Sequence, residues 1–453
     1  MKQTFVILLF FALFACKSEI RDKIEKPNFI VFIADDAAWN DCAPYGNLAI
    51  KTPNINKLAE QGVVFDNAFL TTSSCSPSRC SILTGRYPHS TGAPELHMPL
   101  PANQTLFAGE LQKAGYYTAL AGKYHIGEPR AEFDTVYGGQ PSGCEFWLEA
   151  LENRPKDKPF FLWLAALDPH RDYQPNSIPE PHNPKNVIVP PYLPDNDSTR
   201  KDLALYYDEI SRLDSYLGKV MEELKKQGVD ENTLVIYMTD NGRPFPRAKT
   251  RMYDSGIKTP FIVRWPAKLQ KGRTDALISS IDMAPTFCEL AGAPISETFQ
   301  GISFVPVLND YSAQTRDFIV GEHNWHDFQA HERAIRNQNF LYIRNTFPEL
   351  NASPPADAVR SITYREMIKM YKAGELNKNQ LDCFIEPREA EELYDVKKDP
   401  YQFNNLAQNP EYVQTLKDMQ QLLDSWINDF DDIRSESPTP DKFDRWTGER
   451  IQN

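Results

Sequence analysis

The sequence lacks several features that would assign it to common classes of protein. Its seven cysteines contain no CxxC pair, which argues against a zinc site and against a dense disulfide framework. Lysine and arginine (49) are outnumbered by aspartate and glutamate (62), so a net charge of −13 speaks against a surface that attracts nucleic acid as a whole. No internal repeat is apparent. An anionic ligand of this chain would therefore need a local basic pocket.

Long apolar runs are also scarce, and the clearest one lies at the N-terminus. "MKQTFVILLFFALFAC" has a lysine head, an apolar core at 5–14 and a small residue before Cys16, which is typical of a signal peptide and too short for a permanent membrane span. The four residues that end at Cys16 resemble a bacterial lipobox. We expect a signal peptide at 1–15 and a charged tether at 16–26. The body would then be soluble, exported and lipid-anchored through Cys16, in the bacterial periplasm or at the cell surface. A buried N-terminal helix is the alternative.

Strands and helices alternate through the first part of the chain. Buried strands are predicted within 28–36 and 158–170, and helix–strand units within 51–65, 104–127 and 199–242. The apolar residues of 199–226 recur with the period of an amphipathic helix. This alternation predicts an α/β domain with a large, mostly parallel sheet flanked by helices over 27–330.

The pattern changes after about residue 330. Two strands around a turn are predicted within 333–345, a strand followed by a turn within 389–407, and an amphipathic helix within 410–430. These elements predict a smaller C-terminal α+β subdomain with an antiparallel sheet, over 331–453.

Polar residues follow the predicted strands of the first domain, where ligands bind in sheets of this kind. They are Asp35, Asp36, Lys123, His125, His170, Asp240 and Asn241. Three acids and an amide offer only oxygen ligands, which suits Ca²⁺ or Mg²⁺ and not zinc. Together with Arg79 and Lys249, the cations would form a pocket for a tetrahedral oxyanion. The alternative is that each of these groups only solvates a strand end or the surface.

The stretch "CSPSRCSILTGR" at 75–86 reads as the start of a helix. Ser76 suits the N-cap, Pro77 the first helical position and Gly85 the far cap. A cysteine just before a helix N-terminus has a lowered pKa and is reactive, which is our expectation for Cys75. A capped helix with a buried cysteine, or pairing of Cys75 with Cys80, are the alternatives.

The run Cys75–Arg79, followed by Leu83–Arg86, resembles the signature of the type I sulfatases. Further blocks occur in that family's order: "ADD" at 34–36, "GKYHIG" at 122–127, "DPH" at 168–170, "TDNG" at 239–242, "KTRMYDSG" at 249–256 and "ELYDVKKDP" at 392–400. The resemblance implies an alkaline-phosphatase-like sandwich. It also implies that a maturase converts Cys75 to formylglycine, and that Ca²⁺, ahead of Mg²⁺, is held by Asp35, Asp36, Cys75, Asp240 and Asn241.

The same resemblance assigns roles to the remaining residues of the predicted site. The hydrated formylglycine would attack sulfur in line, while Lys123 and Lys249 neutralise the sulfuryl oxygens and Arg79 fixes the formylglycine and the metal ligands. His170 would donate a proton to the leaving alcohol or amine. His125 would take the proton that releases sulfate. His89, His97, His182 and His331 receive no role.

Several stretches are similar to the sulfamidase (heparan N-sulfatase) branch, among them "SSCSPSR", "DPHR", "VPPYLPD" and "TDNGRPFP". They imply action on N-sulfoglucosamine in a sulfated saccharide, with His323, His326 and Arg171 as candidate substrate contacts. The alternatives are an O-sulfatase acting on another sulfated polysaccharide, a phosphodiesterase or phosphonate hydrolase of the same superfamily, and a glycan-binding lipoprotein on an inactive scaffold.

Overall fold

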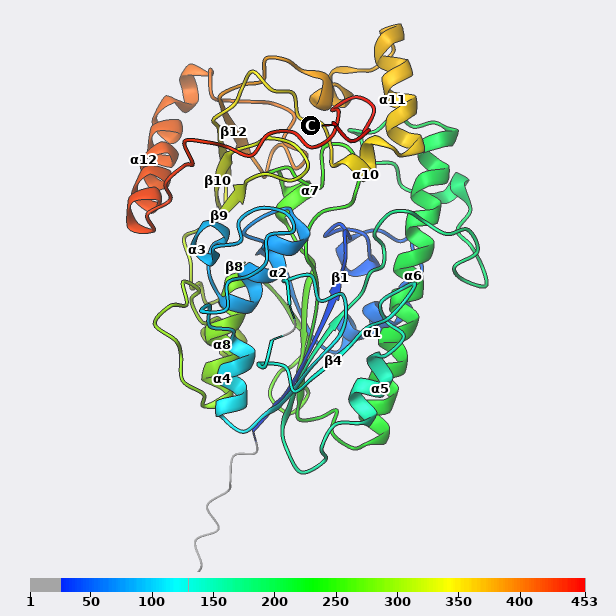
Figure 1. Ribbon diagram of the computed structural model, residues 1–453, viewed down its shortest axis with the longest axis vertical. Helices are drawn as coiled ribbons and strands as arrows, with labels where there is room; N and C mark the ends of the chain where they lie inside the picture. The colour runs from blue at the N-terminus through cyan, green and yellow to red at the C-terminus, as the bar shows by residue number, and fades with distance from the viewer. Residues whose placement is uncertain (1–25, 129, 453) are drawn as a thin grey trace, which may run out of the picture.

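The computed structural model of the protein describes residues 26–128 and 130–452. The predicted signal peptide, the lipidated Cys16 and nearly all of the tether lie outside these residues. Figure 1 shows a large sheet between two layers of helices, with a smaller sheet above one end. Within the described part of the chain, no helix is both long and apolar enough to cross a membrane.

The large sheet has eight strands in the order β4-β3-β5-β1-β6-β7-β2-β8. They are β1 (Asn28–Ala34), β2 (Val63–Phe69), β3 (Tyr117–Gly122), β4 (Thr135–Tyr137), β5 (Phe160–Ala165), β6 (Thr233–Thr239), β7 (Phe261–Arg264) and β8 (Gly272–Ser279). All neighbouring pairs are parallel except those of β7, which runs antiparallel to β6 and β2. The predicted α/β architecture with a mostly parallel sheet is confirmed.

The antiparallel β7 follows from the path of the chain after β6. Residues 240–260, which include the short helix α7 (Asp254–Ile257), stay at the carboxyl edge of the sheet instead of crossing a face. Because β7 starts from that edge, it runs back in the opposite direction to β6. The strand pattern alone did not indicate this reversal.

Helices cover both faces of the large sheet. Those on one face are α1 (Pro53–Glu60), α5 (Trp147–Glu152) and α6 (Asp197–Lys226); those on the other are α2 (Cys75–Thr84), α4 (Phe107–Lys113), α8 (Met283–Ala291) and α9 (Val305–Asn309). The side chains of β1 alternate between the two cores, as a strand buried on both faces requires. The short helix α3 (Pro88–Thr91) follows α2.

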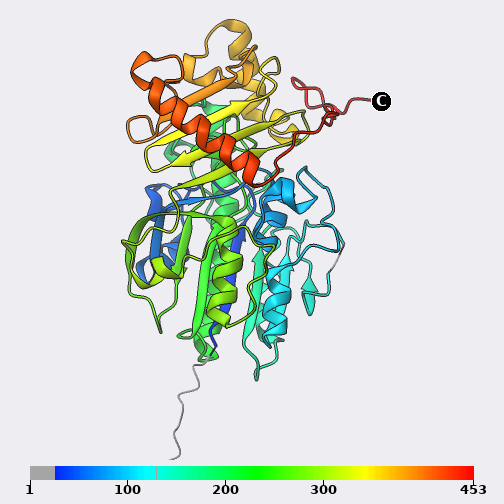
Figure 2. The same cartoon turned by 90° about the vertical axis from the view of Figure 1, so that its left-hand side faces the viewer.

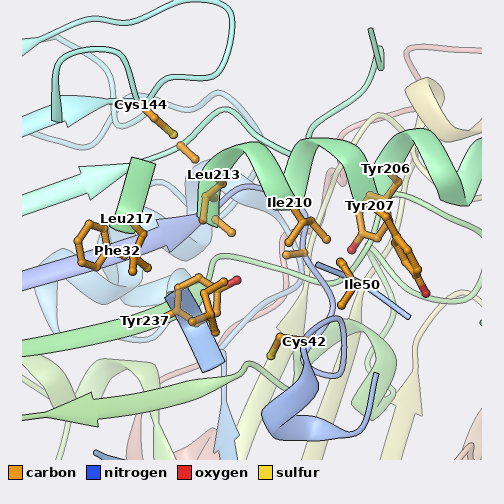
Figure 3. Packing of buried hydrophobic residues seen from close by; sticks show 14 of the residues in the cluster. Phe32, Cys42, Ile50, Cys144, Tyr206, Tyr207, Ile210, Leu213, Leu217 and Tyr237 are labelled. Carbon is orange, nitrogen blue, oxygen red and sulfur yellow. The ribbon is translucent and has the colours of Figure 1, made fainter. Parts of the chain in front are cut away.

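Helix α6 is the amphipathic helix that the sequence predicts most clearly, and its apolar side chains face the large sheet. Ile210, Leu213 and Leu217 of this helix pack over Phe32 of β1 and Tyr237 of β6 (Figure 3). These side chains are almost completely buried, and each apolar side chain buried in this way contributes roughly 1.5–3 kcal/mol. The helix therefore holds the two strands whose ends carry the site.

The smaller sheet is antiparallel, in the order β12-β11-β10-β9. Its strands are β9 (Phe318–His323), β10 (Glu332–Asn337), β11 (Phe340–Asn345) and β12 (Glu391–Asp395), and α10 (Ala356–Val359), α11 (Ile362–Ala373) and α12 (Val413–Asp429) complete this part. Figure 2 shows α12 lying on this sheet. The first strand begins at Phe318, before the boundary at 330/331 that the sequence pattern predicts, because β9 hydrogen-bonds to β10.

Candidate active site

The carboxyl ends of β1 and β6 carry the acidic centre of the site. Asp35 and Asp36 follow β1, and Asp240 and Asn241 follow β6; all four side chains are completely buried. The Asp36 amide donates to Oδ1 of Asp240 over 3.1 Å, and Nδ2 of Asn241 donates to Oδ1 of Asp36 over 2.7 Å. Because the two strands run parallel in register, the structure brings these four predicted residues together.

These residues fit a divalent cation. One oxygen from each of Asp35, Asp36 and Asp240 lies within 4.8 Å of the others. Oδ1 of Asp35 and Oδ1 of Asn241 are buried, and neither has a hydrogen-bond partner among the described residues. Buried oxygens of this kind normally have a partner, and an all-oxygen donor set is the one that Ca²⁺ and Mg²⁺ prefer.

Arg79 braces the acidic centre from helix α2. Its side chain is completely buried, and its Nε and NH2 lie 2.9 Å and 2.7 Å from Oδ2 of Asp240. NH2 is also 3.8 Å from Oδ1 of Asp35, and NH1 donates to the Lys123 carbonyl over 3.2 Å. A guanidinium that contacts these three residues fixes the ends of β1 and β6 and the segment that follows β3.

Two lysines complete the cluster, of which Lys249 is buried and Lys123 is largely covered. Lys123, after β3, pairs with Asp35, and Nζ of Lys249 donates to Oδ2 of Asp36 over 2.7 Å. Burial alone would lower the pKa of each lysine, but these carboxylates outweigh it and hold both pKa values above the ordinary one. Both ammonium groups therefore stay charged at neutral pH beside the acids, as an oxyanion pocket requires.

Cys75 is the first residue of α2, and the structure corrects the predicted helix start. Ser74, in an extended conformation, is the N-cap, and its carbonyl accepts the first helical bond from the Ser78 amide over 2.9 Å. The predicted N-cap, Ser76, already lies in the first turn. Proline at the third helical position is tolerated there because the amides of the first turn have no helical acceptor. Gly85 ends the helix with φ 62°, as predicted.

The expected reactivity of the Cys75 thiol is wrong. Its side chain is 3% exposed and packs against Leu96 and Trp325. Burial raises the pKa of the thiol to about 11, although Lys123 and Lys249 act to lower it. Desolvation therefore outweighs the helix terminus, and an unmodified thiol here is protonated at neutral pH. None of the six described cysteines, which include Cys80, forms a disulfide.

A histidine pair lies beside Cys75. Nε2 of His125 is 2.8 Å from Nδ1 of His97, and the His97 amide donates to Oγ of Ser76 over 2.8 Å. Burial, together with Lys123 and Arg79, lowers the pKa of His125 to about 2, so His125 is neutral. Sequence reasoning gave His97 no role, because nothing in its local pattern indicates contact with a residue far along the chain.

His170 lies beside Asp36 of the acidic centre. Its Nε2 is 3.9 Å from Oδ2 of Asp36 and 3.8 Å from Oδ2 of Asp357, and its Nδ1 contacts the carbonyl of Arg171. Asp357, from α10, also lies 3.9 Å from Nζ of Lys249. It was missed in the sequence because a lone aspartate in a separate subdomain carries no motif.

Arg171 is not brought into this cluster. Its guanidinium makes two bonds of 2.8 Å to Asp202 and one of 3.0 Å to the Pro244 carbonyl, between the rings of Tyr173 and Phe245. These contacts hold the backbone that orients His170.

The two other candidate substrate contacts, His323 and His326, are buried. His326 bonds to Oγ of Ser74 over 2.6 Å, and His323 lies 3.7 Å from Glu332. Both histidines line a cavity of about 20 Å³. Burial lowers the pKa of each. Contact of these residues, or of Arg171, with a substrate stays a prediction.

The remaining histidines make structural contacts: His89 with Glu322, His182 with Asp208 and His331 with Thr346.

The comparisons with known proteins agree with this geometry. The family model described as Sulfatase matches residues 27–147 and 144–293, and the one described as N-sulphoglucosamine sulphohydrolase, C-terminal, matches residues 247–347. An ulvan-active sulfatase of Formosa agariphila is 31% identical over 486 residues, covering 94% of this chain and 79% of the relative. The human N-sulphoglucosamine sulphohydrolase is 29% identical over 449 residues, covering 88% and 89%.

Solved structures share the fold. A protein determined in complex with its substrate D-glucosamine-2-N,6-O-disulfate superposes with a TM-score of 0.70 at 22% identity, covering 91% of this chain and 99% of that chain.

Proposed function

The chain belongs to the sulfatase family, and on that premise we propose that it is a formylglycine-dependent sulfatase acting on an N-sulfated glucosamine residue. Its reaction class is the hydrolysis of a sulfate ester or sulfamate on a sulfated glycan. One observation supports the proposal most strongly. Cys75 is the first residue of a helix, and it lies near Lys123, Lys249 and an acidic centre that has unpartnered oxygens.

Asp35, Asp36, Asp240 and Asn241 would hold the divalent cation, together with the modified side chain at position 75. Ca²⁺ is preferred to Mg²⁺, because such a set of carboxylate and amide oxygens suits the larger ion, whereas Mg²⁺ usually keeps several waters. A cation held there draws electron density from the sulfuryl group and makes the nucleophile easier to deprotonate. Formylglycine supplies a hydrated aldehyde oxygen as that nucleophile.

The cationic side chains prepare the pocket for sulfate. Lys123 and Lys249 bind the sulfuryl oxygens and neutralise the charge that develops on them in the transition state. Each exchanges part of its pairing with Asp35 or Asp36 for the substrate. Arg79 is completely buried and donates from Nε to Asp240 and from NH1 to the Lys123 carbonyl, so it positions both and does not contact sulfate.

Two histidines move protons on opposite sides of the sulfur. His170 donates from Nε2 to the leaving nitrogen or oxygen, with Asp357 stabilising the protonated ring. His125 is neutral and accepts a proton at Nδ1, which is buried and has no partner among the described residues. His97 holds His125 in the orientation that this transfer requires.

The match of residues 247–347 and the human relative favour glucosamine N-sulfate as the group cleaved. The relative from Formosa agariphila favours a second candidate, an O-sulfate of another polysaccharide.

Export through residues 1–15, a lipid anchor at Cys16 and a formylglycine-generating maturase as partner also belong to the proposal. They rest on the sequence pattern alone.

Sulfate release from a small panel tests the proposal. The substrates are glucosamine N-sulfate, glucosamine 6-O-sulfate and an O-sulfated galactose, with Cys75→Ala as the blank. Release from the N-sulfate alone supports the full proposal. Release from an O-sulfate alone supports the second candidate. If the peptide mass shows formylglycine and none of the three substrates releases sulfate, both candidate functions are contradicted for single sugars.

A further inference from the structure

After α12 the chain returns across the carboxyl edge of the large sheet. Figure 1 shows this segment passing above α3 and α2 toward α10. The hydrogen bonds that hold it include those from Oγ1 of Thr439 to Glu95 (2.7 Å), from the Lys442 amide to the Asp327 carbonyl (2.8 Å) and from Arg360 to the Gly448 carbonyl (3.0 Å). The segment is thus fixed to the two loops that flank Cys75.

A short hairpin in this segment carries two cations. Phe443 bridges to Arg450, and the Ile451 amide donates to the Lys442 carbonyl over 3.0 Å. The hairpin lines an open pocket of about 800 Å³ whose inner wall includes Trp325. Trp325 belongs with Cys75 and Leu96 to one small buried cluster, and it donates from Nε1 to the Pro440 carbonyl over 2.8 Å. This cluster therefore lies between the catalytic position and the pocket.

The charges of the pocket do not cancel. Among the described residues, neither Lys442 nor Arg450 makes an ion pair. The acid that lines the pocket, Asp441, is bound by Arg445 over 2.6 Å and 2.8 Å. Nζ of Lys442 lies 5.9 Å from the centroid of the Trp325 ring, so its charge is next to the indole that lines the pocket. In a chain of net charge −13, two unpaired cations at this place attract an anion locally.

We propose that Lys442 and Arg450 form a subsite for a second anionic group, a carboxylate or a sulfate, on the sugar next to the one whose sulfate enters at Cys75. This deepens the proposed function and rests on it. The enzyme would then recognise a disaccharide unit with negative charge on both sugars. Because the cations line a pocket that includes no residue of the acidic centre, they bind the neighbouring sugar and leave the hydrolysis step unchanged.

The test compares the double variant Lys442→Ala/Arg450→Ala with wild type. The substrates are glucosamine N-sulfate, its disaccharide with a uronic acid, the carboxyl-reduced form of that disaccharide, and a disaccharide with a 6-O-sulfated hexose. Losing two charge-assisted contacts at a partly exposed site should raise KM for a charged disaccharide by roughly tenfold, with kcat unchanged. The monosaccharide should not respond. A uronate-specific effect assigns the subsite to a carboxylate; an effect with the sulfated hexose assigns it to a sulfate.

The control variant is Lys417→Ala/Arg365→Ala, which removes the same charge from exposed helix positions. Calorimetric binding of the disaccharides to Cys75→Ala, with and without the double substitution, measures the subsite without turnover and should show the same loss of affinity. A wild-type KM that rises with salt more steeply for the disaccharide than for the monosaccharide is also expected. Equal effects on the monosaccharide and the disaccharides, or unchanged disaccharide affinity, would overturn the subsite. Loss of all sulfate release in wild type would instead defeat the proposed function.

Discussion

Replacing Arg79 with methionine should destabilise the protein strongly, because the guanidinium is completely buried against Asp240 and Asp35. Methionine keeps much of the volume and removes two contacts of 2.7 Å and 2.9 Å to one carboxylate. Breaking a buried ion pair on one side costs about 3–5 kcal/mol, since the partner charge is left unpaired. A loss of this size lowers the thermal midpoint by roughly 3–6 °C for a domain of this size.

The assay is scanning calorimetry at neutral pH in EDTA. Arg200→Met is the matched control, because Arg200 pairs with Asp195 at the surface, where the side chains are 27% and 57% exposed. Such a pair contributes about 1 kcal/mol or less. Calcium should recover part of the loss in Arg79→Met, because the cation neutralises the same carboxylates. Equal midpoints for the two variants would refute the role given to Arg79.

Removing divalent cations should lower the midpoint of wild type, and calcium at a hundred times its Kd should restore about 2.7 kcal/mol. Asn241→Ala, which lacks Oδ1, should show a smaller calcium shift. Burial, followed by Asp168, raises the pKa of Glu209 to about 8 from 4.5. The contribution of Glu209 to the free energy of unfolding is therefore fully present below pH 4.5 and is lost as pH rises through 8. Because glutamine does not titrate, Glu209→Gln should become more stable relative to wild type as pH rises across this window. His97→Phe leaves Nε2 of His125 without a partner and should lower kcat about tenfold with little change in KM.

A specific experimental outcome would contradict each of these predictions. Equal calcium shifts in wild type and Asn241→Ala would remove Asn241 from the ligand set. A stability difference between Glu209→Gln and wild type that does not vary with pH would show that Glu209 does not titrate in this window. A rise in KM at constant kcat in His97→Phe would make His97 a substrate contact instead of a positioning residue.

The acidic centre could be predicted from the sequence because parallel strands bring their carboxyl ends to one edge. Asp36 and Asp240 follow two strands that are recognisable as buried apolar runs. Predicting a parallel sheet was therefore enough to predict that the two side chains lie close together. The Arg79 contact followed from the resemblance of the motif. The amphipathic helix α6 was equally clear, since its stripe has one period over its whole length.

What the sequence could not indicate depends on packing between distant segments. Asp357 reaches the site, and Lys442 reaches the pocket lined by Trp325, from the C-terminal subdomain in stretches without a pattern. The shift of the Cys75 pKa was predicted in the wrong direction. Burial, which depends on Leu96 and Trp325, raises this pKa more than the helix N-terminus lowers it. The reversed β7 depends on where the preceding loop lies in the fold.

The most direct test of the account is sulfate release from glucosamine N-sulfate per mole of protein, with the mass of the peptide that contains Cys75 measured on the same sample. The account predicts formylglycine at position 75, turnover that scales with the modified fraction, and no turnover in Cys75→Ala. Turnover by protein whose Cys75 is fully unmodified, or equal turnover in Cys75→Ala, would contradict it.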